Sequence, residues 1–545
     1  MIIKIILKFF QEKNDALKND ANEKIPEEIL QGLKDLGAFG LQVPVELGGL
    51  GLNNTQYARL CEIVGTHDLG IGITIGAHQS IGFKGILIAG NPEQKQKYLP
   101  KLATGENVAA FALTEPIAGS DAAGIKSRAE PSSDGKHWIL NGSKIWISNG
   151  GFADVFTVFA KTPVKDEVTG ELKDKVTAFI VERKFGGITN SPPEKKMGIK
   201  CSNTAAVYFD NVKIPSENVL GGVGNGFKVA MNILNAGRFG MGASLSGTMK
   251  YAIKKAVEHA SQRVQFGKLI HQYGVIQEKL TRMAVLQYAS ESIAYMLSAN
   301  MDNGSKEYQL EAAVGKIYAS EAAWTVADEA IQVLGGMGFM KDCGLERVLR
   351  DLRIFRIFEG TNDILRLFIA LTGMNYAGKF LKEMERKAKS GDVKVILKVF
   401  GSKIGLNSVE SLSPVVHSQL SSSAQLASQS VSDFGKTIEN VLIKHGKNIA
   451  DNQIVVTKIA NATLDLYAMF AVLSRATRTL NNKLPSSEHE TDLCNLFCID
   501  ASKRIAQNLR DATDSQTLEN CRTISKISRD LIQHGHTVPQ HPIGF

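Results

Sequence analysis

The spacing of apolar residues changes twice along this 545-residue chain, and that change limits what the chain can fold into. Over roughly the first hundred residues, apolar side chains recur every three or four positions, which is typical of helices. From about residue 108 to residue 215 the interval becomes two, which is typical of strands. Long amphipathic helices are then predicted over 226–260, 272–302 and 306–335.

The middle segment is predicted to be a compact antiparallel β unit of sandwich or barrel type. In KHWILNGSKIWISN, two β-rich runs flank Asn141-Gly142, a pair that predicts a hairpin turn. Further strands are predicted in DVFTVFAK, VTAFIVER and AAVYFDNV. Among the flanking helices, PEEILQGLKDL begins with a proline, and Asn54 is a candidate cap of the next helix.

The C-terminal section from residue 376 differs in composition from the rest. Over residues 392–404 an apolar stripe with lysines beside it fits either a membrane-surface helix or a helix packed on its own domain. SLSPVVHSQLSSSAQLASQS is serine-rich and is expected to be a linker or a loosely held surface. The later sequence is again helical.

These patterns predict an α+β protein with four sections. They are an N-terminal helical domain over 1–107, a middle β domain over 108–218, a helical domain with a four-helix bundle over 219–375, and an additional helical domain over 376–545.

Composition excludes several classes of function. A hydrophobic fraction of 43% with 22% charged residues is typical of a soluble globular protein, and no uninterrupted apolar run reaches the ~18 residues of a membrane span. The net charge of +8 fits acidic small substrates or an anionic membrane surface. Basic residues do not alternate with aromatics, so nucleic acid is not expected as a partner.

The cysteines and the N-terminus add two expectations. The six cysteines are scattered and lack a zinc-ligand pattern, so we expect reduced thiols, a reducing compartment and no metal. The opening MIIKIILKFF has no small-residue cleavage site and continues into helix-forming sequence, so neither a signal peptide nor a transit peptide is predicted.

The first stretch with chemical content is FALTEPIAGSD, residues 111–121. A strand ends there and turns through Gly119-Ser120, where backbone N–H groups and hydroxyls could meet an anionic cofactor. Composition alone favours a plain turn.

The second stretch is Trp146-Ile147-Ser148. Residues two apart on a strand share a face, so the indole could stack on a flat ring while the hydroxyl binds its edge. An ordinary core tryptophan beside a surface serine explains the same pattern equally well.

The third stretch is RDLRIFRIFEGTNDI, residues 350–364. Glu359 follows an apolar run, and Thr361–Asp363 are expected to begin a helix. A carboxylate in apolar surroundings has a raised pKa and can serve as a base. A cap or a surface acid is the commoner role of a glutamate beside glycine.

Taken together, in this order and spacing, the three stretches resemble those of the acyl-CoA dehydrogenase family over roughly residues 25–375. The strings LTEPxAGSD and FEGTNDILR are specific to that family. Further strings, HDLGIGITIGAHQSIGFKGI, PPEKKMGIK and GRFGMG, look most similar to the branch that acts on very long acyl chains. The additional C-terminal section, which shorter-chain members lack, is similar to that branch too.

The resemblance implies a flavoprotein in which FAD lies extended between the β domain, the C-terminal helices and a neighbouring subunit. The implied FAD contacts are Phe111, Leu113, Thr114, Gly119, Ser120, Trp146, Ile147, Ser148, Arg263, Gln265, Phe266, Gln332, Val333, Leu334, Gly335, Gly336, Thr361, Asn362 and Asp363. The alternatives to cofactor binding are that Arg263 is a solvated cation at a helix end and that residues 332–336 are a helix C-cap. GGVGNG at 221–226 lacks the βαβ frame of a dinucleotide fingerprint, so nicotinamide binding is not predicted.

The resemblance also implies the reaction and the substrate contacts. Glu359 would take the α-proton of a long-chain acyl-CoA while a hydride leaves the β-carbon for FAD, giving a trans-2-enoyl-CoA. The implied acyl-CoA contacts are Ser120, Asn235, Ala236, Gly237, Arg238, Phe358 and Gly360. Glycines 70, 72 and 76 either leave room for a deep acyl tunnel or allow close helix packing.

The family setting implies partners and a location as well. Electrons would pass to electron-transfer flavoprotein, and the protein would be a homodimer bound peripherally to the matrix side of the mitochondrial inner membrane, acting in β-oxidation. The main rival is a sibling branch that serves in assembling a respiratory complex. An acyl-CoA oxidase and a helical binding protein are the others.

Overall fold

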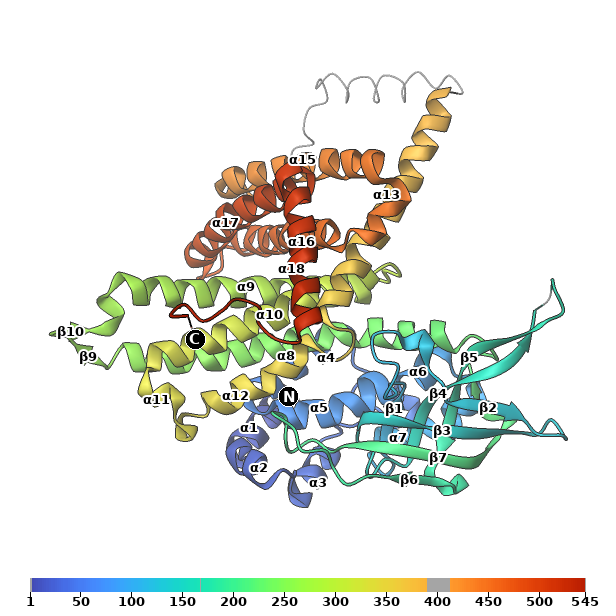
Figure 1. Ribbon diagram of the computed structural model, residues 1–545. Helices are drawn as coiled ribbons and strands as arrows, with labels where there is room; N and C mark the ends of the chain where they lie inside the picture. The colour runs from blue at the N-terminus through green and yellow to red at the C-terminus, as the bar shows by residue number, and fades with distance from the viewer. Residues whose placement is uncertain (1, 167, 390–411, 545) are drawn as a thin grey trace. The chain divides into compact units, whose positions relative to one another are not determined.

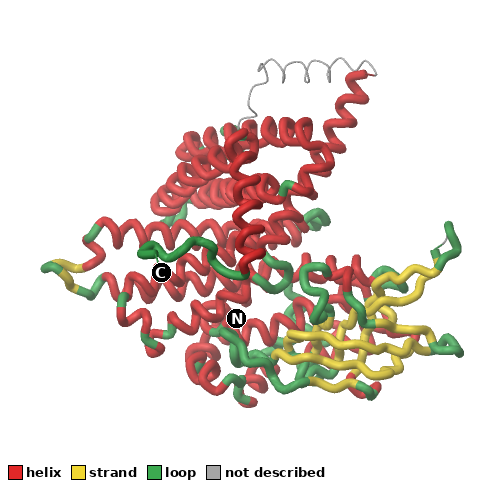
Figure 2. Tube along the Cα trace, in the orientation of Figure 1, coloured by secondary structure: helices red, strands yellow, loops and turns green. Residues whose placement is uncertain are grey.

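The computed structural model describes residues 2–166, 168–389 and 412–544, and the chain divides into two compact units. Unit 1 comprises Met1–Asn362 and unit 2 comprises Asp363–Phe545 (Figure 1). Unit 1 contains helices followed by a sheet and then long helices. The described residues of unit 2 form helices joined by loops (Figure 2). The predicted α+β class with an additional helical section is confirmed.

Unit 1 begins with short helices that pack around one apolar core. This core includes residues from α1, α3, α4 and the long helix α8. After α5 the chain passes through a π-helical turn, Ala77–Gly82. The helices are α1 (Ile2–Glu12), α2 (Ala16–Asn22), α3 (Glu27–Asp35), α4 (Asn54–His67), α5 (Leu69–Gly76), α6 (Lys84–Ala89) and α7 (Pro92–Ala103).

The predicted cap of α4 is displaced by one residue. The side chain of Asn53, not that of Asn54, accepts a hydrogen bond from the backbone N–H of Gln56. The Gln56 side chain accepts one from the backbone of Asn53 in return, which completes a capping box. Asn54 is instead the first helical residue, and its N–H donates to Asp302.

The sheet has eight strands and is mixed rather than antiparallel. Along the sheet the order is β6-β7-β3-β2-β4-β5-β8, and β1 pairs with β4. The strands β1 and β2 both run parallel to β4, whereas the other neighbouring strands are antiparallel. The strands are β1 (Ala109–Ala112), β2 (Arg128–Pro131), β3 (His137–Ser148), β4 (Val155–Lys165), β5 (Leu172–Glu182), β6 (Ile188–Asn190), β7 (Thr204–Pro215) and β8 (Val219–Leu220).

The hairpin predicted at Asn141-Gly142 is wrong, because β3 continues through both residues. The register with β7 shifts between Leu140 and Gly142, so the pair forms an irregularity inside a strand. Glycine is required there because a Cβ on Gly142 would lie 2.2 Å from the Ser127 hydroxyl oxygen of the adjoining segment. The Asn-Gly pair therefore serves a close approach and not a turn.

The long helices of unit 1 match the predicted ranges closely, and they extend away from the sheet (Figures 1 and 2). Helix α8 packs against α4, α9 and α10. A small hairpin of β9 and β10 lies at the end of the bundle remote from the sheet (Figure 1). The elements are α8 (Gly226–Ala260), β9 (Val264–Gln265), β10 (Lys268–Leu269), α9 (Gly274–Asp302), α10 (Gln309–Leu334), α11 (Gly336–Phe339) and α12 (Leu345–Leu352).

Unit 2 is formed by α13 (Asn362–Lys389), α15 (Ser421–His445), α16 (Gln453–Asn481), α17 (Ser487–Thr513) and α18 (Ser515–His534). The serine-rich segment predicted as a linker is a packed helix over much of its length, because Ser423, Ala424 and Ser428 are buried there. Small side chains permit close helix packing, and composition alone does not reveal it. The predicted amphipathic stretch 392–404 lies outside the described residues.

Two helical stretches, Leu69–Ala89 and Gln453–Asn481, are long and apolar enough on average to pass a membrane-span criterion. Uninterrupted apolar runs alone do not identify these two stretches, because polar residues interrupt both. Each stretch has 61% of its most apolar window buried within the protein, as core helices do. This evidence for a membrane span is weak.

Helices α4 and α8 approach so closely that glycine is required at their contact. A Cβ on Gly65 would lie 2.0 Å from the Ser244 carbonyl oxygen, and one on Gly247 would lie 2.0 Å from that of Glu62. Across the same contact, the Thr248 hydroxyl donates to the Gly65 carbonyl at 2.7 Å. Backbone therefore packs directly on backbone here, which fixes the separation of the two helices.

We expect Gly65→Ala to destabilise the protein even though alanine favours a helix by about 1 kcal/mol. Overpacking against a backbone oxygen should outweigh that gain, with a net cost of about 1–3 kcal/mol. The thermal unfolding midpoint would therefore fall. Gly274→Ala is the matched control, because a Cβ at that helix position meets open space. Equal midpoints for the two variants would contradict the argument.

Candidate active site

Glu359 lies in a tight turn between the short 3-10 helix Arg353–Arg356 and the start of α13. Its φ is +53° and that of Gly360 is +91°, so two consecutive residues adopt left-handed backbone conformations. A glutamate in this region is strained, by about 1–3 kcal/mol, and such strain persists where the surroundings impose it. The turn is therefore held by its neighbours and not by local preference.

Two buried cations bind the backbone of this turn. From α8, Arg238 donates to the Glu359 carbonyl oxygen from Nε at 3.2 Å and from Nη2 at 2.9 Å. From α10, Lys316 donates to the Gly360 carbonyl oxygen at 2.8 Å and to Asn362 Oδ1 at 2.9 Å. Both helices thus secure the turn through its carbonyls.

One oxygen of the Glu359 carboxyl group has no hydrogen-bond partner in the described parts of the chain. This oxygen, Oε2, is buried. Burial raises the pKa of this carboxyl, and the positive charges of Arg238 and Lys316 oppose the shift only in part. A carboxylate that is desolvated and unpaired is suited to accept a proton from a substrate.

The predicted acyl-CoA contacts, other than Ser120, lie on the turn itself and on the α8 segment that binds it. Arg238 Nη1 donates to Asn235 Oδ1 at 2.6 Å, so the two polar residues of the α8 segment are joined. Gly237 faces the π-helical turn, because a Cβ there would lie 3.2 Å from the Ser80 carbonyl oxygen. The Phe358 ring packs on Phe355 at 4.9 Å between centroids. Ala236 is buried on the same α8 segment, whereas Ser120 is exposed on the loop after β1.

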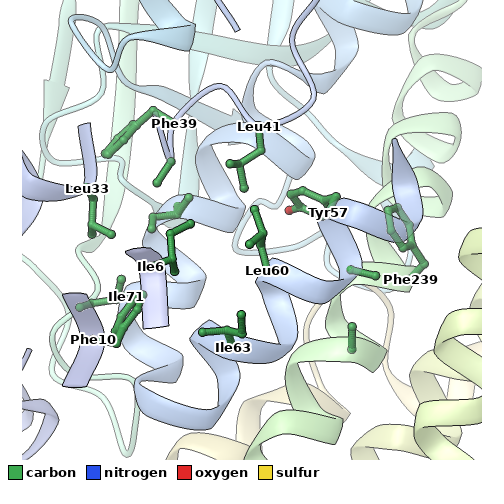
Figure 3. Close-up of a cluster of buried hydrophobic side chains, with 14 of the residues drawn as sticks. Ile6, Phe10, Leu33, Phe39, Leu41, Tyr57, Leu60, Ile63, Ile71 and Phe239 are labelled. Atoms are coloured by element: carbon green, nitrogen blue, oxygen red, sulfur yellow. The ribbon is translucent and has the colours of Figure 1, made fainter. Parts of the chain in front are cut away.

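An apolar pocket lies between the first helices and α8. Tyr57 and Phe239 are neighbours at one side of the surrounding apolar cluster, whereas Phe10 and Leu33 lie at the other side (Figure 3). Phe239 directly follows Arg238, so the Tyr57 side is the one nearer the base. The pocket is lined by Ile6, Phe10, Leu33, Ala38, Leu41, Tyr57, Leu60, Cys61, Val64, Gly72, Ile75, Gly76, Gln79 and Ser244.

The glycines of α5 divide between the two alternatives that the sequence left open. Gly72 and Gly76 line the pocket, and a Cβ on Gly76 would meet only the Ser80 hydroxyl at 3.8 Å. Gly70 instead packs tightly, because a Cβ there would lie 2.3 Å from the Cys201 sulfur. Gly76 therefore leaves room in the pocket and Gly70 permits close packing, whereas a Cβ on Gly72 would lie 3.3 Å from Val64 Cγ1, so Gly72 does both in part.

The loop after β1 carries the first group of predicted cofactor residues. Phe111 packs on Phe159 inside the β domain, and Leu113 is buried beside it. Thr114 is half-buried and its carbonyl accepts from the Ile145 N–H at 3.0 Å. Gly119 and Ser120 are exposed, and no atom lies within 4 Å of a Cβ built on Gly119. Of the predicted cofactor residues in this loop, Gly119 and Ser120 are therefore open and Thr114 is partly so.

A bulge in β3 determines how Trp146 is presented. The register with β7 breaks between Lys144 and Ile147, and Trp146 has a φ of +56°. Lys144 and Ile147 are both buried although three residues apart, so strict alternation fails here. Trp146 stays 65% exposed and Ser148 half-exposed, which leaves an aromatic face and a hydroxyl on the open side. The Ile147 side chain belongs to the core.

The second group of predicted cofactor residues lies far from the first. Arg263, Gln265 and Phe266 belong to the β9–β10 hairpin, and Phe266 is 95% exposed with a φ of +49°. Residues 332–336 form the last turn of α10 and its end, where Gly335 has a φ of +60°. In Figure 1 the hairpin lies at the opposite end of unit 1 from the sheet. One copy of the chain does not bring the two groups together.

Residues 361–363 are not equivalent. Asn362 is buried, and its Nδ2 donates to the Ser320 hydroxyl at 3.0 Å and to Glu321 Oε1 at 3.2 Å. Its side chain therefore stabilises the turn from inside. Thr361 is half-buried and Asp363 is exposed, and α13 begins at Asn362, close to the predicted start.

Sequence reasoning missed two buried lysines that support these segments. Lys316 is 1% exposed in an alanine-rich part of α10, and Lys144 is fully buried in β3. The available signal was a lone basic residue within an otherwise apolar run, because a buried charge needs partners to offset its desolvation.

Known protein families match the chain in consecutive segments. Three family descriptions match consecutive segments: "Acyl-CoA dehydrogenase, N-terminal domain" over 1–106, "Acyl-CoA dehydrogenase, middle domain" over 110–212 and "Acyl-CoA dehydrogenase, C-terminal domain" over 224–373. A fourth, "ACAD9/ACADV, C-terminal domain", matches 418–537.

Individual relatives extend the similarity along the full chain. The bovine (Bos taurus) protein named very long-chain specific acyl-CoA dehydrogenase, mitochondrial, is 59% identical over 99% of this chain and 84% of its own length. The human protein of the same name is 58% identical over 100% of this chain and 84% of its own length. A crystal structure of an acyl-CoA dehydrogenase complexed with FAD from Bacillus anthracis is 34% identical, covers 97% of this chain and 91% of that one, and superposes with a TM-score of 0.82. The chain belongs to the acyl-CoA dehydrogenase family.

Proposed function

We propose that this protein catalyses the FAD-dependent α,β-dehydrogenation of long and very long acyl-CoA thioesters to trans-2-enoyl-CoA, with Glu359 as the base. The observation that carries the proposal is the carboxyl of Glu359, whose Oε2 is buried and has no hydrogen-bond partner among the described residues, in a strained turn near an apolar pocket. The bovine and human relatives are named as very-long-chain dehydrogenases, which supports the same substrate class.

The residues of the β domain fit a flavin. The exposed face of Trp146 can stack on a flat heteroaromatic ring, and the nearby Ser148 hydroxyl can donate to its edge. Thr114, Gly119 and Ser120 offer open backbone and hydroxyl groups on a loop whose base is buried. When bound, FAD would supply the acceptor for the hydride that leaves the β-carbon.

Glu359 would remove the α-proton of the thioester. In water a carboxylate is far too weak a base for this step, so the site must raise its basicity and stabilise the enolate that forms. Desolvation provides the first effect, since it raises the pKa of Glu359. Arg238 and Lys316 keep the base in position through the carbonyls of Glu359 and Gly360.

The same turn offers a donor for the enolate oxygen. The backbone N–H of Glu359 donates to no other group among the described residues, and it lies in the turn that Arg238 and Lys316 fix. A preorganised N–H of this kind stabilises developing negative charge, typically by about 3–4 kcal/mol for one donor in an oxyanion site. We assign it to the thioester carbonyl oxygen.

Replacing Glu359 with glutamine preserves size and removes the base. We expect Glu359→Gln to retain FAD and acyl-CoA binding while kcat falls by at least about 10²–10⁴-fold. Flavin absorbance in an anaerobic titration with palmitoyl-CoA, together with steady-state turnover, measures both properties.

Glu311→Gln provides the matched control. Glu311 also has a buried, unpartnered Oε2 and a pKa raised by burial, but it belongs to the first turn of α10, outside the proposed site. Its turnover should stay close to that of the wild type. Normal turnover in Glu359→Gln would contradict the assignment of the base.

The raised pKa of Glu359 predicts a pH dependence. Because burial raises this pKa above its ordinary value of 4.5, the ionised base is lost as pH falls through a higher value than for an exposed glutamate. We therefore expect kcat/KM, which reports the free enzyme, to fall on the acid side with an apparent pKa above 4.5. An acid limb at or below 4.5 would contradict the proposed environment.

The pocket supports the preference for long chains. It extends from the Tyr57 side, near the base, toward α1, where Ile6 and Phe10 line its remote part. Its lining is mainly apolar, and positions 72 and 76 of the lining are glycines, which have no side chain to narrow the pocket. An acyl tail entering beside Tyr57 would therefore meet Phe10 only after passing α5.

Changes at two depths of the pocket should shift the chain-length optimum in opposite directions. We expect Gly76→Leu to fill the pocket and to lower kcat/KM for palmitoyl-CoA relative to octanoyl-CoA by about 10-fold or more, since misplacement of reacting groups is costly. Phe10→Ala should instead favour chains longer than palmitoyl. A series of acyl-CoA lengths measures both shifts. Uniform losses at every length would exclude the pocket as the acyl site.

We further propose a homodimer in which each FAD is held by both subunits. The two groups of cofactor residues are separated by the 35-residue helix α8, which spans about 50 Å at 1.5 Å per residue. That span exceeds an extended flavin dinucleotide. A second copy would bring its β9–β10 hairpin and α10 end to the β domain of the first.

The remaining elements of the proposal follow the family. Electron-transfer flavoprotein would accept the electrons, and the relatives named mitochondrial support a mitochondrial protein acting in β-oxidation. We assign residues 376–545 as the additional domain and propose that it contacts the inner membrane peripherally. An assembly-factor role is not favoured, because the bovine and human relatives are named as dehydrogenases.

A further inference from the structure

Lys144 is a fully buried cation in β3 that uses all three of its donors. Its Nζ donates to the Leu113 carbonyl oxygen at 3.0 Å, to Glu115 Oε1 at 2.8 Å and to the Phe159 carbonyl oxygen at 2.7 Å. One ammonium group therefore joins the end of β1, the following loop and the middle of β4 to β3.

Glu115 extends this connection to the start of β2. The side chain is 4% exposed, and its carboxylate accepts from the Ser127 N–H at 2.9 Å and from the Lys126 N–H at 2.5 Å as well as from Lys144. The loop that carries Thr114 and Ser120 is thus fastened at both of its ends by one ion pair.

β1 ends at Ala112 and β2 begins at Arg128, and between them the backbone of the described loop bonds to itself at the Glu115–Ala118 turn and from the Gly124 N–H to the Asp121 carbonyl. The buried side chains of Ala118 and Ile125 also anchor the loop in the apolar core. One further bond, from the Ile145 N–H to the Thr114 carbonyl, connects the loop to β3 beside Lys144. The bulge that presents Trp146 begins directly after Lys144. The ion pair therefore lies where the loop and the bulge meet.

Stability alone gives no reason to bury this pair. Desolvation of two charges generally cancels their attraction, and apolar replacements of a buried pair are often neutral or stabilising. Burial lowers the pKa of Lys144 to about 8 despite the opposing effect of Glu115. Burial also raises the pKa of Glu115, but the Lys144 charge and the hydrogen bonds outweigh it and lower the pKa overall. A geometric role explains the pair better.

We propose that the Lys144–Glu115 pair is a positioning element that presets the loop 113–120 and the Trp146 bulge for the flavin before FAD binds. The proposal rests on the proposed function, because it takes FAD as the group that this loop receives. Neither Lys144 nor Glu115 touches the reacting atoms. Their effect passes through the backbone of Leu113 and Thr114.

The double variant Lys144→Met with Glu115→Gln tests the proposal. Lys144→Met alone would leave a buried carboxylate without its cation, and we expect it to fold poorly. The double variant removes both charges, while the amide oxygen introduced at position 115 can still accept from the N–H of Ser127 or Lys126. We expect its apo form to stay folded with a lowered unfolding midpoint, because the Leu113 and Phe159 carbonyls lose their donor. We expect its FAD dissociation constant to rise by about 10-fold or more, and the exchange of the 113–120 loop amides in its apo form to speed up more than that of amides elsewhere in the sheet.

Thr162→Val is the matched control within the same sheet. It removes the buried hydrogen bond between the Thr162 and Thr177 hydroxyls, 2.6 Å long, which joins β4 to β5 and involves neither Lys144 nor Glu115. Its FAD affinity and the exchange of amides 113–120 should equal those of the wild type.

The outcomes separate this proposal from the proposed function. Wild-type FAD affinity and wild-type amide exchange in the double variant would overturn the positioning role. A wild-type protein that binds no FAD would overturn the proposed function instead. Amide exchange in the apo forms would still decide whether the pair orders the loop.

Discussion

The site depends on holding a glutamate firmly without neutralising it. Arg238 and Lys316 lie beside the Glu359 turn, where they donate to the backbone carbonyls of Glu359 and Gly360. A carboxylate that accepted those bonds would have a lowered pKa and would be a weaker base. Binding the turn through its carbonyls fixes the strained backbone and leaves the carboxyl group desolvated. Positioning and basicity, which normally oppose each other, are thus assigned to different atoms of one residue.

That arrangement requires α8 and its neighbours to be fixed relative to one another. Helix α8 carries Arg238, and α4 carries Tyr57 and Cys61 of the pocket wall. The two helices meet backbone to backbone at Gly65 and Gly247, where any side chain would collide with a carbonyl oxygen. The glycines therefore set the distance between the anchor of the base and the wall of the pocket. A looser helix pair would separate the pocket from the turn that it serves.

Much of this could be predicted from the sequence, because hydrophobic spacing reports local structure well. The three long helices of unit 1 and the change to strands follow from it. The irregularity of β3 at Gly142 does not, since the Asn-Gly pair that signals a turn serves a close approach to Ser127 there. The prediction of a linker at the serine-rich start of α15 failed for a similar reason, because small polar residues are found both in linkers and in tightly packed helices. Positive φ at Trp146 and Glu359 is imposed by tertiary contacts that no local pattern contains.

Buried or half-buried lysines and arginines hold irregular backbone at three places in the described chain. Lys144 binds carbonyls beside the β1 loop, Arg238 and Lys316 bind those of the Glu359 turn, and Lys196 donates to the Ser202 carbonyl and to the Thr204 hydroxyl at 2.9 Å in the segment before β7. A buried carbonyl outside helices and sheets needs a donor, and a charged donor forms the stronger bond. Because Lys144, Arg238 and Lys316 extend from a strand or a helix, each fixes the nearby irregular segment to a rigid element, which a neighbouring loop residue cannot do. In this fold, a lone basic residue within an apolar run therefore indicates an irregular segment that must be held in one conformation.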